Sequence, residues 1–375
     1  MTRVLEVTYC FGYGGIRACI QNYISHINKD EFQVDLFIYG ASDSPFKNQL
    51  EEMGCHMYFD PINYIAQKRI RDFVNVLTEF IKKGNYDVVH AHCNLISAWV
   101  TLAAKRAGAK VRISHSHSTS HLGKGVAQKA WCYLRRFIIN RTATTKMACG
   151  QLAGEAMYGK SSNFEILQNG IDVEKFMLRN NDNVAQLRKE FNISKNSKVY
   201  MNITRFDKQK NLPFVIRVFH EIYNLDPTAF FIIGGTESPL ESNRMQIEQY
   251  VTKNKLSDRI KIVGPRMDIE DLYQLADCWI FPSIFEGLPF VPIELQAASV
   301  PVLASDVITK EIDLGLGLVH FLSLDAAYLE WAQVAVETVK TQVDQKLIIE
   351  AFGKYNFDIK QNVKKLEAIY RGVLS

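Results

Sequence analysis

The fold is indicated most directly by the stretch Phe281-Pro282-Ser283-Ile284-Phe285-Glu286-Gly287-Leu288-Pro289-Phe290-Val291-Pro292-Ile293-Glu294. Glu286 follows an apolar strand and precedes a glycine loop, and Glu294 comes one turn into the helix after that loop. A loop that leads into a helix offers backbone N–H groups and the positive end of the helix dipole, which suit a phosphate or a sugar hydroxyl. The carboxylates would accept hydrogen bonds from hydroxyls of a ribose or a sugar. Stabilisation by the dipole would explain Glu294 alone, but not the surrounding P-S-x-x-E-G pattern.

Short β-branched runs alternate with amphipathic helical patterns through the first half of the chain. We expect strands at Val4–Tyr9, Val34–Tyr39, Asp87–Ala91, Val111–Ser114 and Lys146–Cys149. We expect helices at Gly15–Ile27, Ala66–Lys82, Ala98–Ala107 and Val126–Arg141. Apolar strands alternating with helices indicate a parallel sheet that is covered on both faces.

A second series of the same kind follows a turn at Asn169–Asp172 and a polar run at Asn180–Asn183. Its expected strands are Lys198–Ile203, Phe230–Ile233, Ile260–Val263, Trp279–Pro282 and Pro301–Ala304. We therefore predict an N-terminal domain over 1–172 and a C-terminal domain over 173–355, both doubly wound α/β domains. Segment 356–375 is expected to return to the first domain as a helix over Asp358–Leu374, with Leu366, Ile369, Tyr370 and Val373 on one stripe. Ligands of open α/β sheets bind at the carboxyl ends of strands, so we expect a deep cleft between the domains.

Composition bounds the class of protein. Hydrophobic residues make up 47% and charged residues 22% of 375 positions, which is typical of a soluble globular chain of two domains. No apolar run approaches the roughly 18 residues needed to cross a bilayer. A glutamate interrupts the first apolar run, Thr2–Cys10, which therefore indicates a strand and not a signal peptide. Seven scattered cysteines without a C-x-x-C pair make a zinc site or a disulfide framework improbable, so we expect a cytoplasmic protein.

The net charge of +4 hides an asymmetry between the two halves. Residues 1–170 carry 20 Lys and Arg against 13 Asp and Glu, and no acidic residue lies between Asp87 and Glu155. This interval indicates a negatively charged partner for the first half, and an ordinary solvated basic surface is the alternative. We expect no nucleic acid as that partner.

Two cations, Arg205 and Lys210, come at the end of one expected strand and the start of the next helix. Fixed cations there would stabilise the charge that a diphosphate leaving group develops. The chain contains no Asp-x-Asp pair to hold a divalent ion on such a diphosphate, so we expect neither a metal nor another cofactor. The loop Gly12–Arg17 lacks the G-x-G-x-x-G spacing, and no acidic residue ends the second strand, so NAD is improbable.

Several segments together resemble one family. The glutamate-x7-glutamate stretch is similar to the motif of retaining family-four glycosyltransferases, particularly those of bacterial capsule and exopolysaccharide assembly. The matching pieces, in the family's order, are the glycine loop Phe11–Ile16, Asp87–His92, Gln168–Asp172, Ile203–Asn211 and Phe231–Gly235. Gln168 replaces the family's proline, Ser299 replaces a glycine, and Asn202 or Thr204 stands near another glycine position. None of these departures removes a charged group.

The resemblance implies a metal-independent, retaining enzyme of the GT-B architecture. It implies catalytic roles for Arg205, Lys210, Glu286 and His115. Contacts with the donor are implied for Gly14, Gly15, Asn169, Thr204, Gly234, Gly264, Arg266, Gly287, Leu288, Pro289 and Glu294. The donor diphosphate would lie between the Gly14-Gly15 loop and the two cations, with Glu294 on the ribose and Glu286 on the transferred sugar. UDP is expected as the nucleotide because it is common in the family.

Two pairs of histidines, His90 with His92 and His115 with His117, end two expected neighbouring strands. Alternate residues on a strand share a face, so each pair points one way. The resemblance places a histidine at the donor sugar or the acceptor, and it aligns with His115, with His117 as second choice. We assign His92 and His117 to the acceptor side, and for His90 a hydrogen-bonded structural role is favoured.

The acceptor implied by the family is a saccharide or a polyprenyl-diphosphate-linked saccharide. Segment 124–146 mixes basic and large apolar residues, which fits a helix lying on the anionic inner face of the plasma membrane. The basic residues assigned to that contact are Lys124, Lys129, Arg135, Arg136 and Arg141. An ordinary domain helix is the simpler interpretation. A nucleotide-sugar-binding accessory protein without turnover, a sugar-nucleotide epimerase and a phosphorylase remain as alternative functions.

Overall fold

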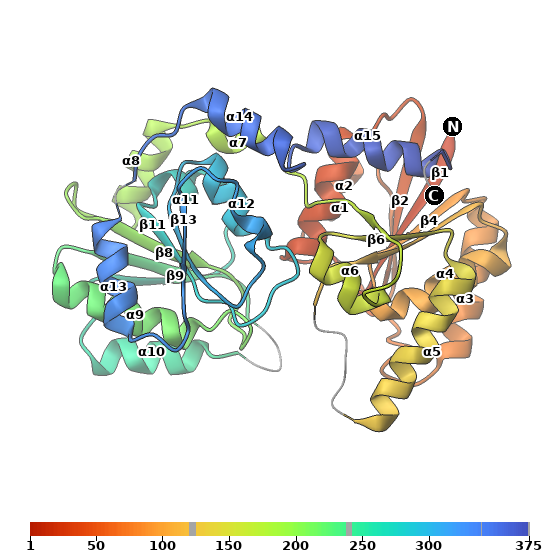
Figure 1. The fold of residues 1–375 in the computed structure, drawn as a ribbon, viewed down its shortest axis with the longest axis horizontal. Coiled ribbons are helices and arrows are strands. Elements are labelled where there is room, and N and C mark those ends of the chain that lie inside the picture. Colours follow the sequence, from red (N-terminus) through yellow and green to blue (C-terminus); the bar gives the residue numbers. More distant parts are fainter. Residues whose placement is uncertain (120–124, 238–241, 339, 374–375) are drawn as a thin grey trace. The chain divides into compact units, whose positions relative to one another are not determined.

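The computed structural model of the chain describes residues 1–119, 125–237, 242–338 and 340–373. Two compact units are present, one formed by Met1–Ile171 with Asn356–Ser375 and the other by Asp172–Tyr355. Each unit is built on its own parallel sheet, and helices pack against both sheets (Figure 1). The chain thus has the two α/β sheets that the sequence predicts.

The sheet of the first unit has seven strands in the order β3-β2-β1-β4-β5-β6-β7. These strands are β1 (Thr2–Thr8), β2 (Phe32–Tyr39), β3 (Met57–Asp60), β4 (Val88–Ala91), β5 (Val111–Ser116), β6 (Thr145–Ala148) and β7 (Glu165–Ile166). Its helices are α1 (Gly15–His26), α2 (Lys47–Glu52), α3 (Ile70–Gly84), η1 (Asn94–Ile96), α4 (Ser97–Ala107), α5 (Val126–Thr142), α6 (Gln151–Tyr158) and α15 (Ile359–Tyr370). The strand order reverses between β1 and β4, which makes this point the topological switch where open α/β sheets bind ligands.

The second unit repeats this plan with six strands in the order β10-β9-β8-β11-β12-β13. Its strands are β8 (Val199–Ile203), β9 (Phe230–Gly234), β10 (Ile260–Val263), β11 (Cys278–Phe281), β12 (Val302–Ser305) and β13 (Val319–Leu322). Its helices are α7 (Val173–Met177), α8 (Asn181–Glu190), α9 (Leu212–Leu225), α10 (Arg244–Lys253), α11 (Ile269–Leu275), α12 (Phe290–Ala297), η2 (Lys310–Ile312), α13 (Tyr328–Glu337) and α14 (Gln345–Lys354). Here the order reverses between β8 and β11.

Burial of apolar strands and helix stripes holds each unit together. In β1 every residue from Val4 to Thr8 is buried, which is expected for a central strand of a parallel sheet that is covered on both faces. Helix α3 buries Phe73, Val74, Leu77 and Ile81 on one stripe and leaves its other face mostly polar. The core of the second unit is centred on α9 and on Trp331 of α13.

Helix α15 packs against α1 and belongs to the first unit, although it comes last in the chain (Figure 1). Its buried face contains Val363, Leu366, Ile369 and Tyr370. Arg371 donates two hydrogen bonds of 2.6 Å to the carboxylate of Glu31, just before β2. The C-terminal segment is therefore part of the first unit's core.

Some predicted elements differ from the structure. The helix predicted from Ala66 begins at Ile70, because a turn ending in Lys68, with φ 57°, precedes it. The helix predicted over Asp358–Leu374 ends at Tyr370, so Val373 lies beyond it and is exposed, and Leu374 lies outside the described residues. Predicted strand ends are shifted by one or two residues, and β3, β7 and β13 were not predicted.

Candidate active site

The residues that the sequence assigned to catalysis in the second unit follow the two strands at its topological switch. Thr204 and Arg205 come directly after β8, and the loop with Glu286 comes after β11. β8 and β11 are parallel neighbours, pairing Tyr200 with Cys278. Their carboxyl ends therefore meet at one edge of the sheet, where a ligand of this fold class is expected.

Lys210 and Glu286 form a close ion pair at this edge. The Lys210 Nζ lies 2.5 Å from Glu286 Oε1, and the two side chains are only 14% and 8% exposed. Gln209 closes the arrangement, because its Nε2 donates to Glu286 Oε2 at 3.0 Å and to the Phe285 carbonyl at 2.9 Å. The loops after β8 and β11 are thus joined by one cation, one carboxylate and one amide.

Arg205 lies on the solvent side of the same loop. Its side chain is 47% exposed, and Nε lies 3.2 Å from the carboxylate of Asp207. Asp207 itself is buried and accepts the backbone N–H of Lys210 at 3.0 Å. Thr204 donates to Asn202 Oδ1 at 2.7 Å, and Asn202 donates to the Ile280 carbonyl of β11. Arg205 is therefore the more accessible of the two cations.

Glu294 lies in α12, which begins at Phe290 after Pro289. Its Oε2 accepts a hydrogen bond of 2.6 Å from the Tyr273 hydroxyl, which holds the carboxylate in one place. Leu288 is buried beneath the loop, whereas Gly287 is partly exposed. Pro289 at the N-cap position of α12 has no side-chain group that could cap the first turn, and a helix start of this kind suits a ligand oxygen.

Three other predicted donor residues have different surroundings. At Gly234 a Cβ would lie 2.3 Å from the Val263 carbonyl of the neighbouring strand, so the packing of β9 on β10 requires glycine. At Gly264 a Cβ would meet no atom of the described residues within 4 Å, apart from those of its two chain neighbours. Arg266 forms ion pairs with Glu190, at 2.7 Å, and with Asp268. These hydrogen bonds raise the pKa of the guanidinium, and the one to Asp268 has the larger effect. This guanidinium is already bound by two carboxylates.

In the first unit, the predicted glycine loop leads into α1. Gly14 caps the helix without a side-chain hydrogen bond, and Gly14 and Gly15 are both exposed. Asn169 is buried. The start of α1 is therefore exposed at Gly14 and Gly15, and a helix start is where the fold class binds anions.

All four predicted histidines meet at the carboxyl edge of the first unit, because β4 and β5 are neighbouring strands. His90 Nε2 lies 3.0 Å from His115 Nδ1, and His92 Nδ1 lies 2.8 Å from His117 Nε2. Glu6 of β1 lies beneath them, with one carboxylate oxygen 2.6 Å from His92 Nε2. Its other oxygen accepts a 2.6 Å hydrogen bond from the Tyr370 hydroxyl.

Burial shapes the charges in this cluster. Burial lowers the pKa of His92 to about 4, and burial also lowers that of His115 well below its usual value, so both are neutral at pH 7. Although burial alone would raise the pKa of Glu6, His90 and His92 hold it well below its usual range. One nitrogen each of His90, His92 and His115 lies within 4.8 Å of the others, a spacing that could also hold a metal ion.

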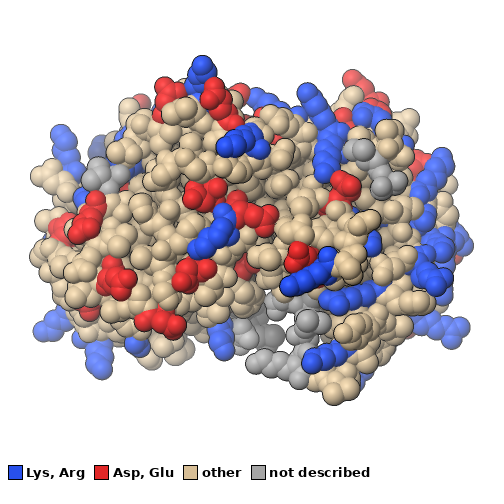
Figure 2. Space-filling model, in the orientation of Figure 1, with Lys and Arg blue, Asp and Glu red and all other residues tan. Residues whose placement is uncertain are grey.

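Helix α5 carries most of the basic residues that were assigned to a membrane contact. Lys129 and Arg141 are exposed, Arg135 lies over the Trp131 ring, and Arg136 donates to two carbonyls at the end of α6. Lys124 lies outside the described residues. Large apolar side chains on the helix are also exposed: Val126, Trp131, Tyr133, Leu134 and Phe137. Figure 2 shows basic side chains gathered along the edge of this unit where Figure 1 places α3 and α4.

Among the described residues, no helix combines the length and the apolarity that crossing a membrane requires. This finding concerns only the segments that the structure describes.

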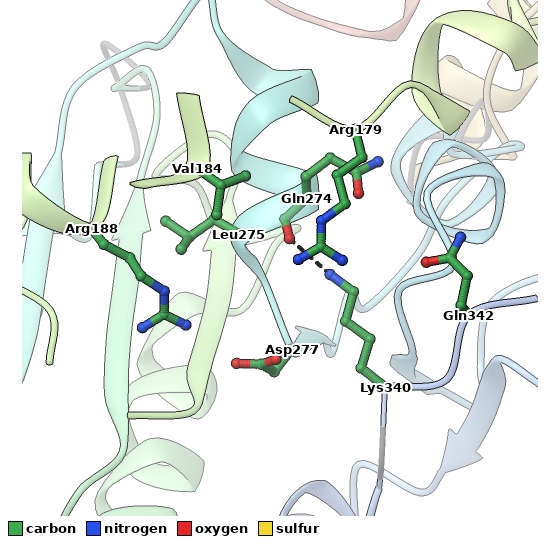
Figure 3. A pocket seen from close by; sticks show the side chains of 8 residues that line it. All are labelled: Arg179, Val184, Arg188, Gln274, Leu275, Asp277, Lys340 and Gln342. Atoms are coloured by element: carbon green, nitrogen blue, oxygen red, sulfur yellow. Dashed lines mark hydrogen bonds between the residues drawn. The ribbon is translucent and has the colours of Figure 1, made fainter. Parts of the chain in front are cut away.

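A separate cavity of about 310 Å³ lies in the second unit (Figure 3). Arg179, Arg188 and Lys340 line it together with Asp277 and Gln274. Lys340 donates to the carbonyls of Gln274 and Ala276, and burial lowers its pKa to about 8. None of the residues assigned to catalysis or donor binding lines this cavity.

Four residues of these arrangements were not assigned to a site from the sequence. Gln209 and Tyr273 hold Glu286 and Glu294, and no local pattern marks either of them. Glu6 carried a signal, because it is an acidic residue inside the apolar first strand. Tyr370 was predicted only as part of an apolar stripe, and its hydroxyl partner could not be read from a helical period.

Both halves of the chain match glycosyltransferase families. Residues 183–310 match the family described as glycosyl transferases group 1, and residues 14–160 match the glycosyl transferase 4-like domain. The chain therefore belongs to the family-four glycosyltransferases of the GT-B architecture.

Particular relatives agree with this class. EpsF of Bacillus subtilis (strain 168), named as a glycosyltransferase, is 28% identical over 98% of this chain and 96% of its own. The Escherichia coli UDP-Gal:alpha-D-GlcNAc-diphosphoundecaprenol alpha-1,3-galactosyltransferase is 23% identical over 73% of this chain and 72% of its own. The crystal structure of Anabaena Alr3699/HepE in complex with UDP-glucose has a TM-score of 0.76, with 18% identity over 98% of this chain and all of that one.

Proposed function

We propose that this glycosyltransferase transfers a sugar from a nucleotide sugar, with UDP as the nucleotide, and retains the anomeric configuration. The observation that carries the proposal is the placement of Arg205, Lys210 and Glu286 after the two strands at the switch of the second sheet. The UDP-glucose in the HepE structure and the UDP-Gal in the name of the E. coli relative support the choice of nucleotide.

The acceptor we propose is a saccharide or a polyprenyl-diphosphate-linked saccharide in the assembly of a capsule or exopolysaccharide. The sequence resembles capsule and exopolysaccharide enzymes, and the E. coli relative is named for a diphosphoundecaprenol acceptor. Such a lipid-linked acceptor would place the enzyme at the inner face of the plasma membrane.

The proposed reaction is a front-face substitution. The bond between the anomeric carbon and the diphosphate oxygen breaks while the acceptor hydroxyl attacks from the same face and gives its proton to the departing phosphate oxygen. Arg205 and Lys210 stabilise the developing diphosphate charge in place of a metal ion. Glu286 orients the transferred sugar, and Glu294 accepts hydrogen bonds from the ribose hydroxyls.

Formation of the donor complex can leave the Lys210–Glu286 pair in place. Lys210 Nζ has three N–H donors, one of which is directed at Glu286 Oε1 in this structure. The others can bind phosphate oxygens while this contact is kept. The Lys210 ammonium would then bind both Glu286, which orients the sugar, and the diphosphate leaving group, and would fix their positions relative to each other.

A screen of donors tests the proposal. The purified protein is combined with UDP-, GDP- and dTDP-sugars, and binding is followed by thermal shift and turnover by release of nucleotide. One UDP-sugar should be turned over by the wild type but not by Lys210→Ala or Glu286→Ala. Lys253→Ala, which changes an exposed lysine of α10, is the matched control and should keep full activity.

The alternative functions give different results in the same screen. Donor binding without turnover, even with lipid-linked acceptors, would favour an accessory protein. Conversion of the donor to its epimer in the absence of acceptor would favour an epimerase. A product of inverted anomeric configuration, detected by proton NMR coupling constants, would exclude the retaining mechanism.

We also propose that α5 rests on an anionic lipid surface. Between Val126 and Thr142 the helix has four basic residues and no acidic one, and it exposes Trp131, Tyr133 and Phe137. Aromatic side chains at the lipid interface together with lysines and arginines are the features of an interfacial helix.

Cosedimentation with vesicles tests this contact. Binding to vesicles that contain the anionic lipid phosphatidylglycerol should fall strongly in Trp131→Ser/Phe137→Ser and at high salt. Met245→Ser, at an exposed apolar residue of α10, is the control. Binding that ignores both anionic lipid and the double substitution would exclude the membrane role of α5.

A further inference from the structure

At the carboxyl edge of the first sheet, Glu6, Tyr370 and the four histidines form a buried cluster of hydrogen bonds. The donor and the acceptor of each bond can be assigned. The chain of hydrogen bonds starts from Glu6, whose carboxylate is an acceptor only. The Tyr370 hydroxyl donates its single hydrogen to Glu6, and the pKa of Tyr370 is raised well above its usual value, first by burial and then by Glu6. The Tyr370 oxygen must therefore act as an acceptor toward its remaining neighbour.

That neighbour is His90, whose Nδ1 lies 2.9 Å from the Tyr370 oxygen and 3.3 Å from Glu6 Oε2. Both of these atoms accept, so His90 Nδ1 carries a hydrogen. A neutral His90 then has its lone pair on Nε2, which faces His115 Nδ1 at 3.0 Å. His115 must donate from Nδ1, and its own lone pair is left on Nε2.

A second branch leads from Glu6 to His117. Glu6 accepts from His92 Nε2 at 2.6 Å, and the neutral His92 therefore has its lone pair on Nδ1. His117 Nε2 lies 2.8 Å from this lone pair and donates its hydrogen to it. One carboxylate thus fixes the hydrogen positions of four imidazoles through two branches.

The end of the first branch points to a ligand. His115 is completely buried, and its Nε2 has no hydrogen-bond partner among the described residues. An imidazole nitrogen that is left without a partner in a buried site is costly unless a substrate satisfies it. Because the histidine nitrogens face one another in pairs instead of converging on one point, the geometry favours a hydrogen-bonded relay over a metal centre.

We propose that Glu6 is a positioning residue that acts through His90 to fix His115 as the Nδ1–H tautomer, so that its Nε2 accepts a hydrogen bond from a hydroxyl of the sugar substrate. This inference rests on the proposed transferase function and adds the direction of one substrate contact. Neither Glu6 nor Tyr370 touches the substrate in this assignment. The groups that face His90 are Glu6, His92, His115 and Tyr370, and a second proton on His90 would reverse the role of His115.

Glu6→Gln provides a sharp test, because an amide has one accepting oxygen and one donating nitrogen where the carboxylate has two acceptors. If the amide nitrogen faces Tyr370, the tyrosine turns its hydrogen toward His90, and His115 gains a hydrogen on Nε2. If the nitrogen faces His92, the hydrogens of His92 and His117 reverse instead. One of the two branches must therefore change its tautomers.

Two variants serve as controls. Tyr370→Phe removes the hydroxyl but leaves Glu6 Oε2 facing His90 Nδ1, so the hydrogen order should be retained. Asp35→Asn changes another fully buried carboxylate of the same sheet, bound to Arg3 and Tyr86 and outside the relay. This control separates the effect of removing a buried charge from the effect of changing the hydrogen positions on the histidines.

The experiment is ¹⁵N NMR of histidine-labelled protein, which distinguishes the protonated from the unprotonated ring nitrogen of each neutral histidine. We expect an unprotonated Nε2 on His115 in the wild type, Tyr370→Phe and Asp35→Asn, and a reversed branch in Glu6→Gln. With a donor and acceptor that the wild type turns over, the His115 Nε2 resonance should shift. If Glu6→Gln reverses the branch that ends at His115, its kcat/KM should fall on the order of 10- to 100-fold.

Other outcomes would overturn the inference. These are a hydrogen on wild-type His115 Nε2, unchanged tautomers in Glu6→Gln, no shift of the Nε2 resonance with substrates that are turned over, or one equivalent of tightly bound zinc in the purified protein. Failure of the proposed function is seen separately, because a wild type without turnover still reports its tautomers.

Discussion

Replacing Lys210 with methionine is expected to destabilise the second unit as well as abolish turnover. The side chain of Glu286 is only 8% exposed, and the change removes its cationic partner. Gln209 remains as a hydrogen-bond donor to its carboxylate at 3.0 Å. Removing one partner of a fully buried pair costs about 3–5 kcal/mol, and the contact with Gln209 and the residual exposure place this variant at the lower end, about 3 kcal/mol. The free energy of unfolding should fall by that amount.

A double-mutant cycle isolates the pair itself. Glu286→Gln should cost about 2 kcal/mol, because it leaves the Lys210 ammonium without its carboxylate in a mostly buried site. The double variant Lys210→Met/Glu286→Gln has no uncompensated charge and should cost about 3 kcal/mol, which gives a coupling energy of about 2 kcal/mol.

The assay is urea unfolding followed by tryptophan fluorescence in a Trp99→Phe/Trp131→Phe background. The remaining tryptophans, Trp279 and Trp331, are both fully buried in the second unit and report its transition alone. Restricting the signal to one unit matters because proteins with several domains often unfold in more than one step. A coupling energy below about 0.5 kcal/mol, the lower limit for residues in contact, would show that the pair is not formed in solution.

Three further changes have expected outcomes. Between pH 8 and about 10.5 Lys340 is deprotonated in the folded protein but still protonated in the unfolded chain. The free energy of unfolding of the wild type should therefore rise over this range by about 3 kcal/mol relative to that of Lys340→Met. A difference between the two proteins that does not change with pH would contradict the lowered pKa. Lys255 follows α10 with φ 56°, a backbone conformation that is strained for a residue with a side chain. Lys255→Gly should therefore increase the free energy of unfolding by about 1 kcal/mol and raise Tm, whereas a lower Tm would show that this strain is absent. Tyr273→Phe frees Glu294 and should weaken donor binding roughly 3- to 10-fold by calorimetry; an equal effect in Tyr200→Phe would make it unspecific.

The two sheets could be predicted because central parallel strands are continuous apolar runs. The strands near each switch, such as β1, β4 and β11, are buried over most or all of their length and were all predicted. The missed strands lie at or near sheet edges, where the pattern is weaker: β7 has two residues, and all four residues of β13 are only partly buried. Edge strands carry less hydrophobic signal because one side lacks a neighbour.

The candidate site was predictable in position but not in its internal contacts. Strand ends and glycine loops indicated where Lys210, Glu286 and the histidines would lie. Which atoms pair depends on contacts between segments far apart in the sequence, such as those of Gln209 with Glu286 and of Tyr370 with Glu6, 77 and 364 positions apart. A local period carries no information about such partners.

The serine that replaces the family's glycine shows a limit of another kind. Ser299 has φ 56°, a conformation that favours glycine, and its Oγ accepts the backbone N–H of Val343 at 3.3 Å. The sequence revealed the substitution, but only the structure shows that a hydrogen bond offsets part of the backbone strain.

The return of α15 to the first unit has a consequence for how the protein is made. Synthesis proceeds from the N-terminus, and β1 leaves the ribosome long before Tyr370, so Glu6 lacks its tyrosine partner until residue 370 has been translated. The second unit, Asp172–Tyr355, is continuous and can complete its fold earlier. Chains released before α15 has been made therefore have a complete second sheet, but their first sheet lacks the helix that covers part of its core. Cellular proteases can recognise such chains by that exposed core.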